Sequence, residues 1–206
     1  MSSIRTHWEQ VWLDRDPATN SWYQDTPTRS LELVRLAGVG PDDPIVDIGG
    51  GCSALAIALS GIGYKDLTVL DIAQGALNTL DRRLIFEFGA HAVRLVRTDV
   101  LSWRPDRPYR LWHDRALNHF FSDPVDRQRY VELAAETITR GGHLVVAAFA
   151  PDGPDTCSGL TVHRRYPEGL AAEFAEAFDL VRITRELHET PWRGTQSFQY
   201  VLLQRR

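Results

Sequence analysis

The chain has 206 residues, of which 43% are hydrophobic and 24% charged, enough for one well-covered core and too few for two independent domains. The formal net charge of -4 provides no basic surface for a phosphate backbone, which disfavours nucleic acid as a partner. No apolar run approaches the roughly 18 to 20 residues that span a bilayer, and the N-terminus lacks the apolar core of a signal peptide. We therefore expect a soluble, cytoplasmic protein with a single domain over residues 1–206. Cys52 and Cys157 have no CxxC spacing and are expected as buried thiols.

Residues 1–40 are expected to be an extension in front of the core. An amphipathic stretch at 4–13, which includes Trp8 and Trp12, predicts a helix, and a second helix is expected at about 29–37. The turn-rich linker between them reads SWYQDTP, so Trp22 and Tyr23 have to be buried by something. They either plug the edge of the core or cover a ligand.

From residue 44 onward, predicted strands and helices alternate. The strand candidates are short apolar runs at 44–48, 67–71, 93–97, 109–113 and 143–149, and helical spacing occurs at 55–59, 76–88 and 131–138. This order predicts βαβ units with right-handed crossovers, and hence an α/β fold with a mainly parallel sheet covered by helices on both faces.

The C-terminal part departs from this alternation. Residues 180–188 and 197–203 both read as strands, and the segment between them is too short for a crossover helix. They are therefore expected to pair as an antiparallel hairpin.

The segment VDIGGGCSAL at 46–55 ends a predicted strand in a glycine loop. Gly49, Gly51 and Ala54, followed by Asp71, satisfy the dinucleotide pattern G-x-G-x-x-G/A with its ribose-binding acid. Asp47 speaks against a dinucleotide, because its carboxylate would repel a pyrophosphate at this loop. A sulfonium and an ammonium would instead be attracted, by on the order of 4 kcal/mol for a 4 Å contact at an effective dielectric near 20, before desolvation.

These motifs resemble those of the class I S-adenosylmethionine-dependent methyltransferases, from about residue 40 to the end. VDIGGGCSAL resembles the family's D/E-x-G-x-G-x-G loop, which implies a cofactor-binding role for Asp47 and for Gly49, Gly50 and Gly51. Ser53 replaces the third glycine and could cap the following helix. The resemblance implies a Rossmann-like, seven-stranded sheet of order 3-2-1-4-5-7-6 with strand 7 antiparallel. It also implies a cofactor-binding core at 41–150, with an acceptor-side loop, a helix and the terminal hairpin at 151–206.

Two further motifs imply the contacts of the adenosine part. TVLDIA resembles the family's second strand, which places Asp71 on the ribose hydroxyls and Ile72 against the adenine. RTDVLSW resembles the third, which places Asp99 at the adenine amino group and Val100 on the ring face.

The residues themselves also favour ligand contact. Each of these acids follows a parallel strand, where open α/β sheets bind ligands, and a carboxylate can accept both donors of a vicinal diol. Alternatively, Asp71 and Asp99 each cap the next helix, and Asp47 braces the loop through backbone N–H groups.

The candidate catalytic residues follow the fourth strand, in WHDRALNHFFSDP. Methyl transfer relies mainly on positioning, and a general base is needed only if the nucleophile arrives protonated. We predict His113, Asp114 and His119 as catalytic residues; alternatively, His113 is a core histidine and His119 bonds a backbone carbonyl. Asp114 and Arg115 could pair with each other, or bind the ammonium and the carboxylate of the ligand. The spacing is poor for a metal site, and none is expected.

A narrower resemblance, to a bacterial-type subgroup with S-W-Y/F-Q, H-D-R-A and F-A-P-D-G-P-x-x-C-S-G-L, implies that Trp22 and Tyr23 cover the ligand. The long loop at 149–166 is the best candidate for acceptor selection, or it is a solvated mobile loop. Its possible contacts are Cys157, His163, Arg164 and Arg165. Trp192 and Arg193 either close the same cleft or pack in a turn.

The expected activity is methyl transfer from S-adenosylmethionine to an O, N or S nucleophile of a small molecule. A protein acceptor, including lysine, is an alternative. An NAD(P)-dependent oxidoreductase and a non-catalytic binding module also remain open, because a fold alone excludes neither.

Overall fold

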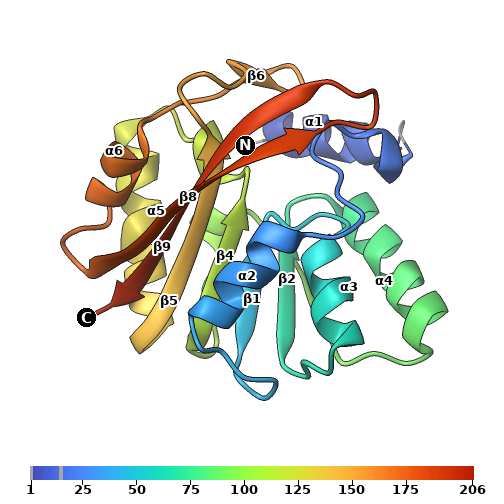
Figure 1. Ribbon diagram of the computed structural model, residues 1–206. Coiled ribbons are helices and arrows are strands. Elements are labelled where there is room, and N and C mark those ends of the chain that lie inside the picture. Colours follow the sequence, from blue (N-terminus) through green and yellow to red (C-terminus); the bar gives the residue numbers. More distant parts are fainter. Residues whose placement is uncertain (1, 14–15) are drawn as a thin grey trace.

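Seven strands form one sheet in the order β3-β2-β1-β4-β5-β9-β8 in the computed structural model, which describes residues 2–13 and 16–206 (Figure 1). The strands are β1 (Ile45–Ile48), β2 (Leu67–Asp71), β3 (Arg94–Arg97), β4 (Tyr109–Arg115), β5 (Ile138–Phe149), β8 (Phe178–Glu189) and β9 (Thr195–Arg205). Strands β1 to β5 pair in parallel, whereas β9 is antiparallel to both β5 and β8. The predicted strand order and terminal hairpin are confirmed, with β8 and β9 as the sixth and seventh strands of the prediction.

Helices cover both faces of this sheet, as predicted. The helices of the described chain are α1 (Ser2–Leu13), α2 (Thr28–Leu36), α3 (Ala54–Gly61), α4 (Gln74–Phe88), α5 (Pro124–Thr137) and α6 (Pro167–Ala172). Short 3-10 turns are η1 (Pro17–Thr19), η2 (Val100–Ser102) and η3 (Asn118–Phe120). Buried side chains of α2, α3 and α4 join one hydrophobic cluster, and those of α5 and α6 join the other. No helix in the described part of the chain is long and apolar enough to cross a membrane.

Strand β5 contributes to both clusters, which explains its continuous apolar sequence. Val145 and Phe149 point into the cluster with α2 to α4, whereas Leu144 and Val146 point into the cluster with α5 and α6. All four are fully buried, and each such side chain stabilises the fold by roughly 1.5–3 kcal/mol. A charge at any of these positions would be buried without a partner.

The structure differs from the prediction at the start of the fifth strand and in the loop that follows it. The helical pattern was expected to include Ile138, but α5 ends at Thr137 and Ile138 begins β5, where it pairs with Tyr109. A buried, β-branched residue fits this strand position well. The loop at 149–166 is also not structureless, since it contains a small hairpin of β6 (Thr156–Cys157) and β7 (Leu160–Thr161).

Candidate functional site

The glycine loop leaves β1 with two residues in the left-handed region. Gly49 has φ +62° and Gly51 has φ +56°, values that residues with a side chain rarely adopt. A Cβ at Gly49 would collide with Leu117, and one at Gly51 would lie 2.5 Å from the Trp12 ring. Glycine is therefore required both for the turn and for the close approach of these side chains.

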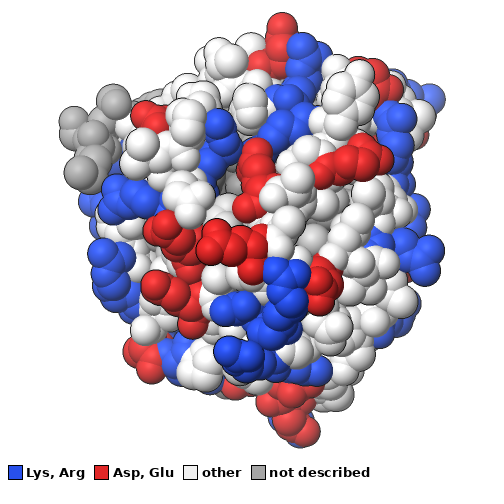
Figure 2. Space-filling model, turned by 90° about the vertical axis from the view of Figure 1, so that its left-hand side faces the viewer, with Lys and Arg blue, Asp and Glu red and all other residues white. Residues whose placement is uncertain are grey.

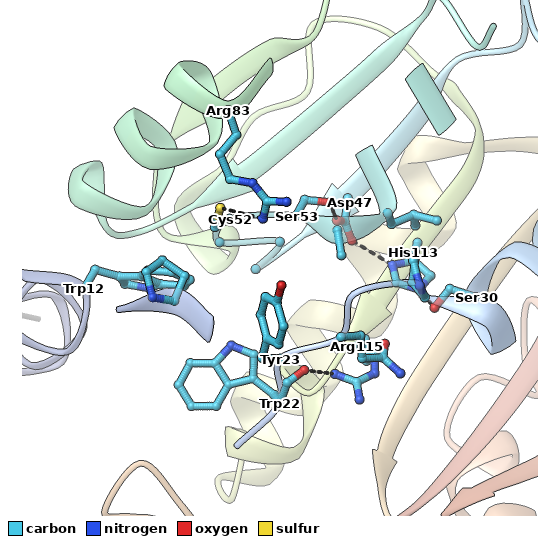
Figure 3. A pocket seen from close by; sticks show the side chains of 18 residues that line it. Trp12, Trp22, Tyr23, Ser30, Asp47, Cys52, Ser53, Arg83, His113 and Arg115 are labelled. Carbon is cyan, nitrogen blue, oxygen red and sulfur yellow. Dashed lines mark hydrogen bonds and ion pairs between the residues drawn. The ribbon is translucent and has the colours of Figure 1, made fainter. Parts of the chain in front are cut away.

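Asp47 lies inside a chain of buried side chains beneath this loop (Figure 3). Its Oδ1 accepts a hydrogen bond from His113 Nδ1 at 2.7 Å, and its Oδ2 accepts one from Ser53 Oγ at 2.5 Å. His113 Nε2 in turn lies 2.8 Å from Ser30 Oγ on α2. Asp47 and His113 face each other because they are paired residues of the neighbouring parallel strands β1 and β4. The chain joins α2, both central strands and the glycine loop.

Ser53 has a second role at the start of α3. Its Oγ accepts a hydrogen bond from Ala56 N at 2.9 Å, so it caps the helix, as predicted for the residue that replaces the third glycine. Asp47 therefore braces the loop, although through side chains rather than the backbone N–H groups that we considered.

Asp71 ends β2 and turns its carboxylate toward the same loop. Its Oδ2 accepts a hydrogen bond from Gly51 N at 2.9 Å, and its Oδ1 accepts one from Ala73 N at 2.8 Å. Burial raises the pKa of this carboxyl to about 6. An ionised carboxylate has about four lone-pair positions, so the two backbone bonds leave acceptor capacity for a ligand.

A cavity of about 530 Å³ begins at Asp71 and runs along the carboxyl ends of the central strands. Ile72, Asp99 and Val100 line it beside Asp71, so the four residues predicted to contact adenosine lie together. Asp99 also accepts a hydrogen bond from Leu101 N at 3.0 Å and thereby caps η2, as the alternative interpretation required.

A second cavity of about 100 Å³ lies at the glycine loop (Figure 3). Asp47, Ser53 and His113 line it together with the three glycines, Trp22 and Tyr23. Arg115 lines both cavities, and so do Trp12, Trp22 and Gly49. The two cavities are therefore adjacent parts of one candidate site.

Arg115 is held by the N-terminal linker and the terminal hairpin. Its Nη1 donates to Trp22 O at 3.0 Å, its Nε donates to the Tyr200 hydroxyl at 3.0 Å, and its guanidinium lies over the Phe198 ring. Glu186 lies 3.8 Å from Nη2, beyond hydrogen-bond distance. Within the described residues Nη2 has no hydrogen-bond partner, although it is buried.

Sequence reasoning missed Arg83, a second guanidinium that lines the smaller cavity from α4. Its nearest partners in the structure are weak: Cys52 Sγ at 3.7 Å and Glu87 Oε1 at 3.6 Å. The sequence offered no signal for it, because Arg83 is one of two adjacent arginines on a helix and belongs to none of the motifs.

Helix α1 lies across the carboxyl-terminal edge of the sheet (Figure 1). Glu9 holds it there, because its Oε1 accepts from Gln74 N at 2.9 Å and its Oε2 accepts from Gly75 N at 3.1 Å, at the N-terminus of α4. An acidic side chain is favourable at that end of a helix. The segment predicted to be an extension thus forms part of the wall of the site.

The aromatic residues of the N-terminal segment meet over the larger cavity. Trp8 contacts Trp22 with ring centroids 6.2 Å apart and Phe120 at 5.3 Å, and Trp12 contacts Trp22 at 6.4 Å. All four line the cavity. Tyr23 lines the smaller cavity instead, and its hydroxyl donates to Asp25.

Asp114 points to the opposite face of the sheet from His113. Its carboxylate accepts hydrogen bonds from the backbone N–H groups of Leu117 and Asn118 and from the Tyr130 hydroxyl, the last at 2.5 Å. It is fully buried, and burial raises its pKa to about 6. These contacts identify Asp114 as a brace of the turn after β4; its catalytic role stays a prediction, and neither cavity includes it among its lining residues.

His119 is fully buried behind the cavity wall. Its ring lies edge-on to Phe120, at 4.5 Å between centroids, and contacts Phe149 at 4.9 Å. Neither ring nitrogen has a hydrogen-bond partner within the described residues, so it does not bond a backbone carbonyl through its side chain. Burial, helped by Arg165 and Arg115, lowers its pKa to about 3.

The loop at 149–166 contributes one side chain to the cavity, Cys157. Arg164 bonds the backbone of the same loop, and Arg165 binds Glu173 and Asn118, which anchors the loop to the turn after β4. Trp192 is exposed at the tip of the terminal hairpin and lines neither cavity. Across residues 2–13 and 16–206, no three His, Cys, Asp or Glu side chains are grouped to hold a metal ion.

No family model and no curated protein sequence matches the chain. Solved structures, in contrast, match over nearly its whole length. The N-methyltransferase NodS from Bradyrhizobium japonicum WM9, in complex with S-adenosyl-L-homocysteine, has 17% identity and a TM-score of 0.73, covering 98% of each chain. A structure described for the conversion of a disulfide bond into a thioacetal group during echinomycin biosynthesis has 16% identity and a TM-score of 0.77, covering 98% of this chain and 93% of that one.

A third match is the magnesium protoporphyrin IX methyltransferase ChlM from Synechocystis PCC 6803 with bound S-adenosylmethionine, at 13% identity and a TM-score of 0.67. It covers 100% of this chain and 83% of that one. The protein therefore has the fold of the class I S-adenosylmethionine-dependent methyltransferases, as the sequence motifs predicted.

Proposed function

We propose that the protein is an S-adenosylmethionine-dependent methyltransferase. The observation that carries this proposal is the cavity that joins Asp71 and Asp99 to an acidic glycine loop at one edge of the sheet. Asp71 would accept the ribose hydroxyls with its remaining lone pairs, and Asp99 would accept the adenine amino group. Ile72 and Val100 would enclose the adenine ring.

The amino-acid end of the donor would lie beside the glycine loop. There Arg115 has a buried Nη2 without a hydrogen-bond partner, which suits a carboxylate. Trp22 and Tyr23 would cover this end from the linker. When bound, the donor supplies an electrophilic methyl group on a positively charged sulfur, and Asp47 keeps a negative charge within the same part of the site.

The charge of Asp47 also favours this donor over a dinucleotide. Both oxygens of Asp47 already accept hydrogen bonds, and a diphosphate at the loop would face this buried carboxylate directly. Arg83 and Arg115 line the same cavity and would offset part of this repulsion. An NAD(P)-dependent oxidoreductase is thus the less favoured alternative.

We propose a small-molecule acceptor with an O, N or S nucleophile. NodS is an N-methyltransferase, MtfA is a glycopeptide N-methyltransferase, and ChlM methylates magnesium protoporphyrin IX. The space for an acceptor is a cavity of about 530 Å³ that the donor would share, which favours a small molecule. The face in Figure 2 carries Lys and Arg side chains interspersed with Asp and Glu, an arrangement that provides no uniformly basic patch there for nucleic acid.

Most of the rate enhancement is expected from holding the acceptor in line with the methyl group. If the nucleophile arrives protonated, His119 is the best candidate for the base among the three predicted residues. Both of its nitrogens lack a hydrogen-bond partner within the described residues. Both nitrogens of His113, in contrast, are occupied by Asp47 and Ser30. The pKa of His119, about 3, makes it a weak proton acceptor, however, and like Asp114 it lines neither cavity.

Calorimetry tests the proposal. S-adenosylmethionine and its demethylated product should bind with micromolar affinity, and NAD should not bind. Binding of NAD alone would refute the donor. Methyl transfer is tested separately, by screening labelled donor against a metabolite and protein extract. Donor binding without transfer to any component would favour the non-catalytic binding module.

A further inference from the structure

The larger cavity extends well beyond the part assigned to adenosine. Asp71, Ile72, Asp99 and Val100 occupy the end at β2 and β3. The remaining wall comes from α1, the N-terminal linker, the turn after β4, α5 and the loop after β5. Its aromatic side chains are Trp8, Trp12, Trp22, Phe120 and Phe121, and Cys157 lines it too. If the proposed donor occupies the first part, the acceptor has to occupy the second.

The rings of this second part are arranged edge to face. Trp8 makes an interplanar angle of 74° with Trp22 and 71° with Phe120, at centroid distances of 6.2 and 5.3 Å. This is the geometry in which aromatic rings attract one another, and an additional ring can continue it. A planar aromatic ring can therefore make face and edge contacts with these side chains that a puckered, saturated ring of similar size cannot make.

The charges around the cavity disfavour a cationic acceptor. Among its described lining residues the carboxylates are Asp71, Asp99 and Asp126. The first two belong to the adenosine end, and Asp126 lies on α5 one turn from Arg129, which lines the cavity as well. Cys157 is a neutral thiol, because burial raises its pKa to about 12. An ammonium group, such as that of lysine, would find no carboxylate beside the tryptophans.

We infer that the methyl acceptor is a small aromatic molecule without a cationic group, bound against Trp8, Trp22 and Phe120 with its nucleophile directed toward the glycine loop. This inference rests on the proposed methyltransferase function. It adds a substrate class to that function and assigns Trp8 as a specificity-determining residue. Cys157 would contact the ring of the acceptor through its sulfur, a favourable pairing.

Two thiols of similar size, one with a planar aromatic ring and one with a puckered saturated ring, provide the test. Phenylmethanethiol and cyclohexylmethanethiol carry the same nucleophile, and the cyclohexyl ring is the more hydrophobic, so hydrophobicity alone would favour it. A lysine-containing peptide is the third probe. Binding is measured by quenching of tryptophan fluorescence with the demethylated donor bound, and turnover by transfer of labelled methyl.

We expect the phenyl compound to bind about tenfold more tightly than the cyclohexyl compound, the effect of roughly two ring contacts. Trp8→Ala should reduce this preference to less than threefold. Trp192→Ala, a matched control because Trp192 is exposed on the terminal hairpin, should leave the preference unchanged. If Trp8→Ala does not fold, Phe120→Leu takes its place.

Equal affinities, tighter binding of the cyclohexyl compound, no binding of either thiol, or a preference for the peptide would each overturn the inference. So would a preference that survives both cavity substitutions. Failure of the methyltransferase proposal itself would be visible separately, because calorimetry would then detect no donor binding before any acceptor is added.

Discussion

Lowering the pH from 7 to 5 is expected to weaken binding of the demethylated donor product by about tenfold, through protonation of Asp71. Burial raises the pKa of this carboxyl to about 6. Each of its oxygens already accepts a backbone N–H, so a proton on either oxygen competes with those bonds and with the ribose hydroxyls. If only the ionised form binds, the affinity falls about tenfold for each pH unit well below 6.

The contribution of Asp71 to the stability of the protein should change in the opposite direction. The pKa of Asp71 is higher in the folded protein than the 3.8 of an unperturbed carboxyl, so between about pH 4 and 6 the folded state holds more protons than the unfolded state. The contribution of Asp71 to stability therefore falls as the pH rises through this range, and Asp114 adds the same trend. His119 contributes the opposite trend below about pH 6.5, because burial lowers its pKa to about 3. Thermal unfolding measured at pH 5 and 7 therefore separates weaker binding from a loss of folded protein.

Calorimetry with the demethylated product at pH 5, 6 and 7 measures the effect without a sulfonium charge. Asp71→Asn should bind about tenfold more weakly at pH 7 and lose the pH dependence. Asp99→Asn is the matched control, since it should bind more weakly but keep the dependence. An affinity that is flat between pH 7 and 5, or a dependence that persists in Asp71→Asn, would refute the assignment of Asp71 to the ribose.

The two other predictions concern buried residues after β4. Asp114→Asn leaves one acceptor oxygen where two accept hydrogen bonds from Tyr130 and from the turn after β4. We expect the free energy of unfolding to fall by about 2 kcal/mol and Tm, measured by thermal unfolding, to fall by roughly 4–8 °C. Donor affinity should not change. An unchanged Tm with a lower kcat would instead place Asp114 at the reacting atoms. His119→Phe should lower kcat at least 100-fold if His119 is the base, whereas Tm should not fall, because two unpartnered nitrogens are removed. An unchanged kcat would make His119 a core residue.

The parts of the fold that the sequence predicted well are those set by local patterns. Parallel strands buried on both faces are continuous apolar runs, so β2 was predicted with its observed ends. Because such strands end at one edge of the sheet, Asp71 and Asp99 could be placed together without knowledge of their side-chain contacts. Ile138 shows the limit, since a helix end and a strand start meet there without a turn between them.

The missed parts of the site depend on contacts between distant segments. Ser30 lies 83 positions from His113, and Glu9 lies 65 positions from Gln74 at the start of α4. Neither residue forms a motif by itself, because a serine on a helix and a glutamate on an amphipathic helix are common surface residues. Only the packing of α1 and α2 against the sheet gives them a role in the site.

The hydrogen bonds of Asp47 are compatible with a role of its charge in selecting the ligand. Ligand discrimination through a buried carboxylate depends on its net charge, and a hydrogen bond does not remove that charge. Ser53 is a neutral donor, and when the ring of His113 is neutral with its proton on Nδ1, the Ser30 hydroxyl can donate to Nε2. In that arrangement every partner of Asp47 is satisfied and the negative charge remains beside the glycine loop. Ser30, on α2, supports this arrangement through its hydrogen bond to the side of the His113 ring that faces away from Asp47.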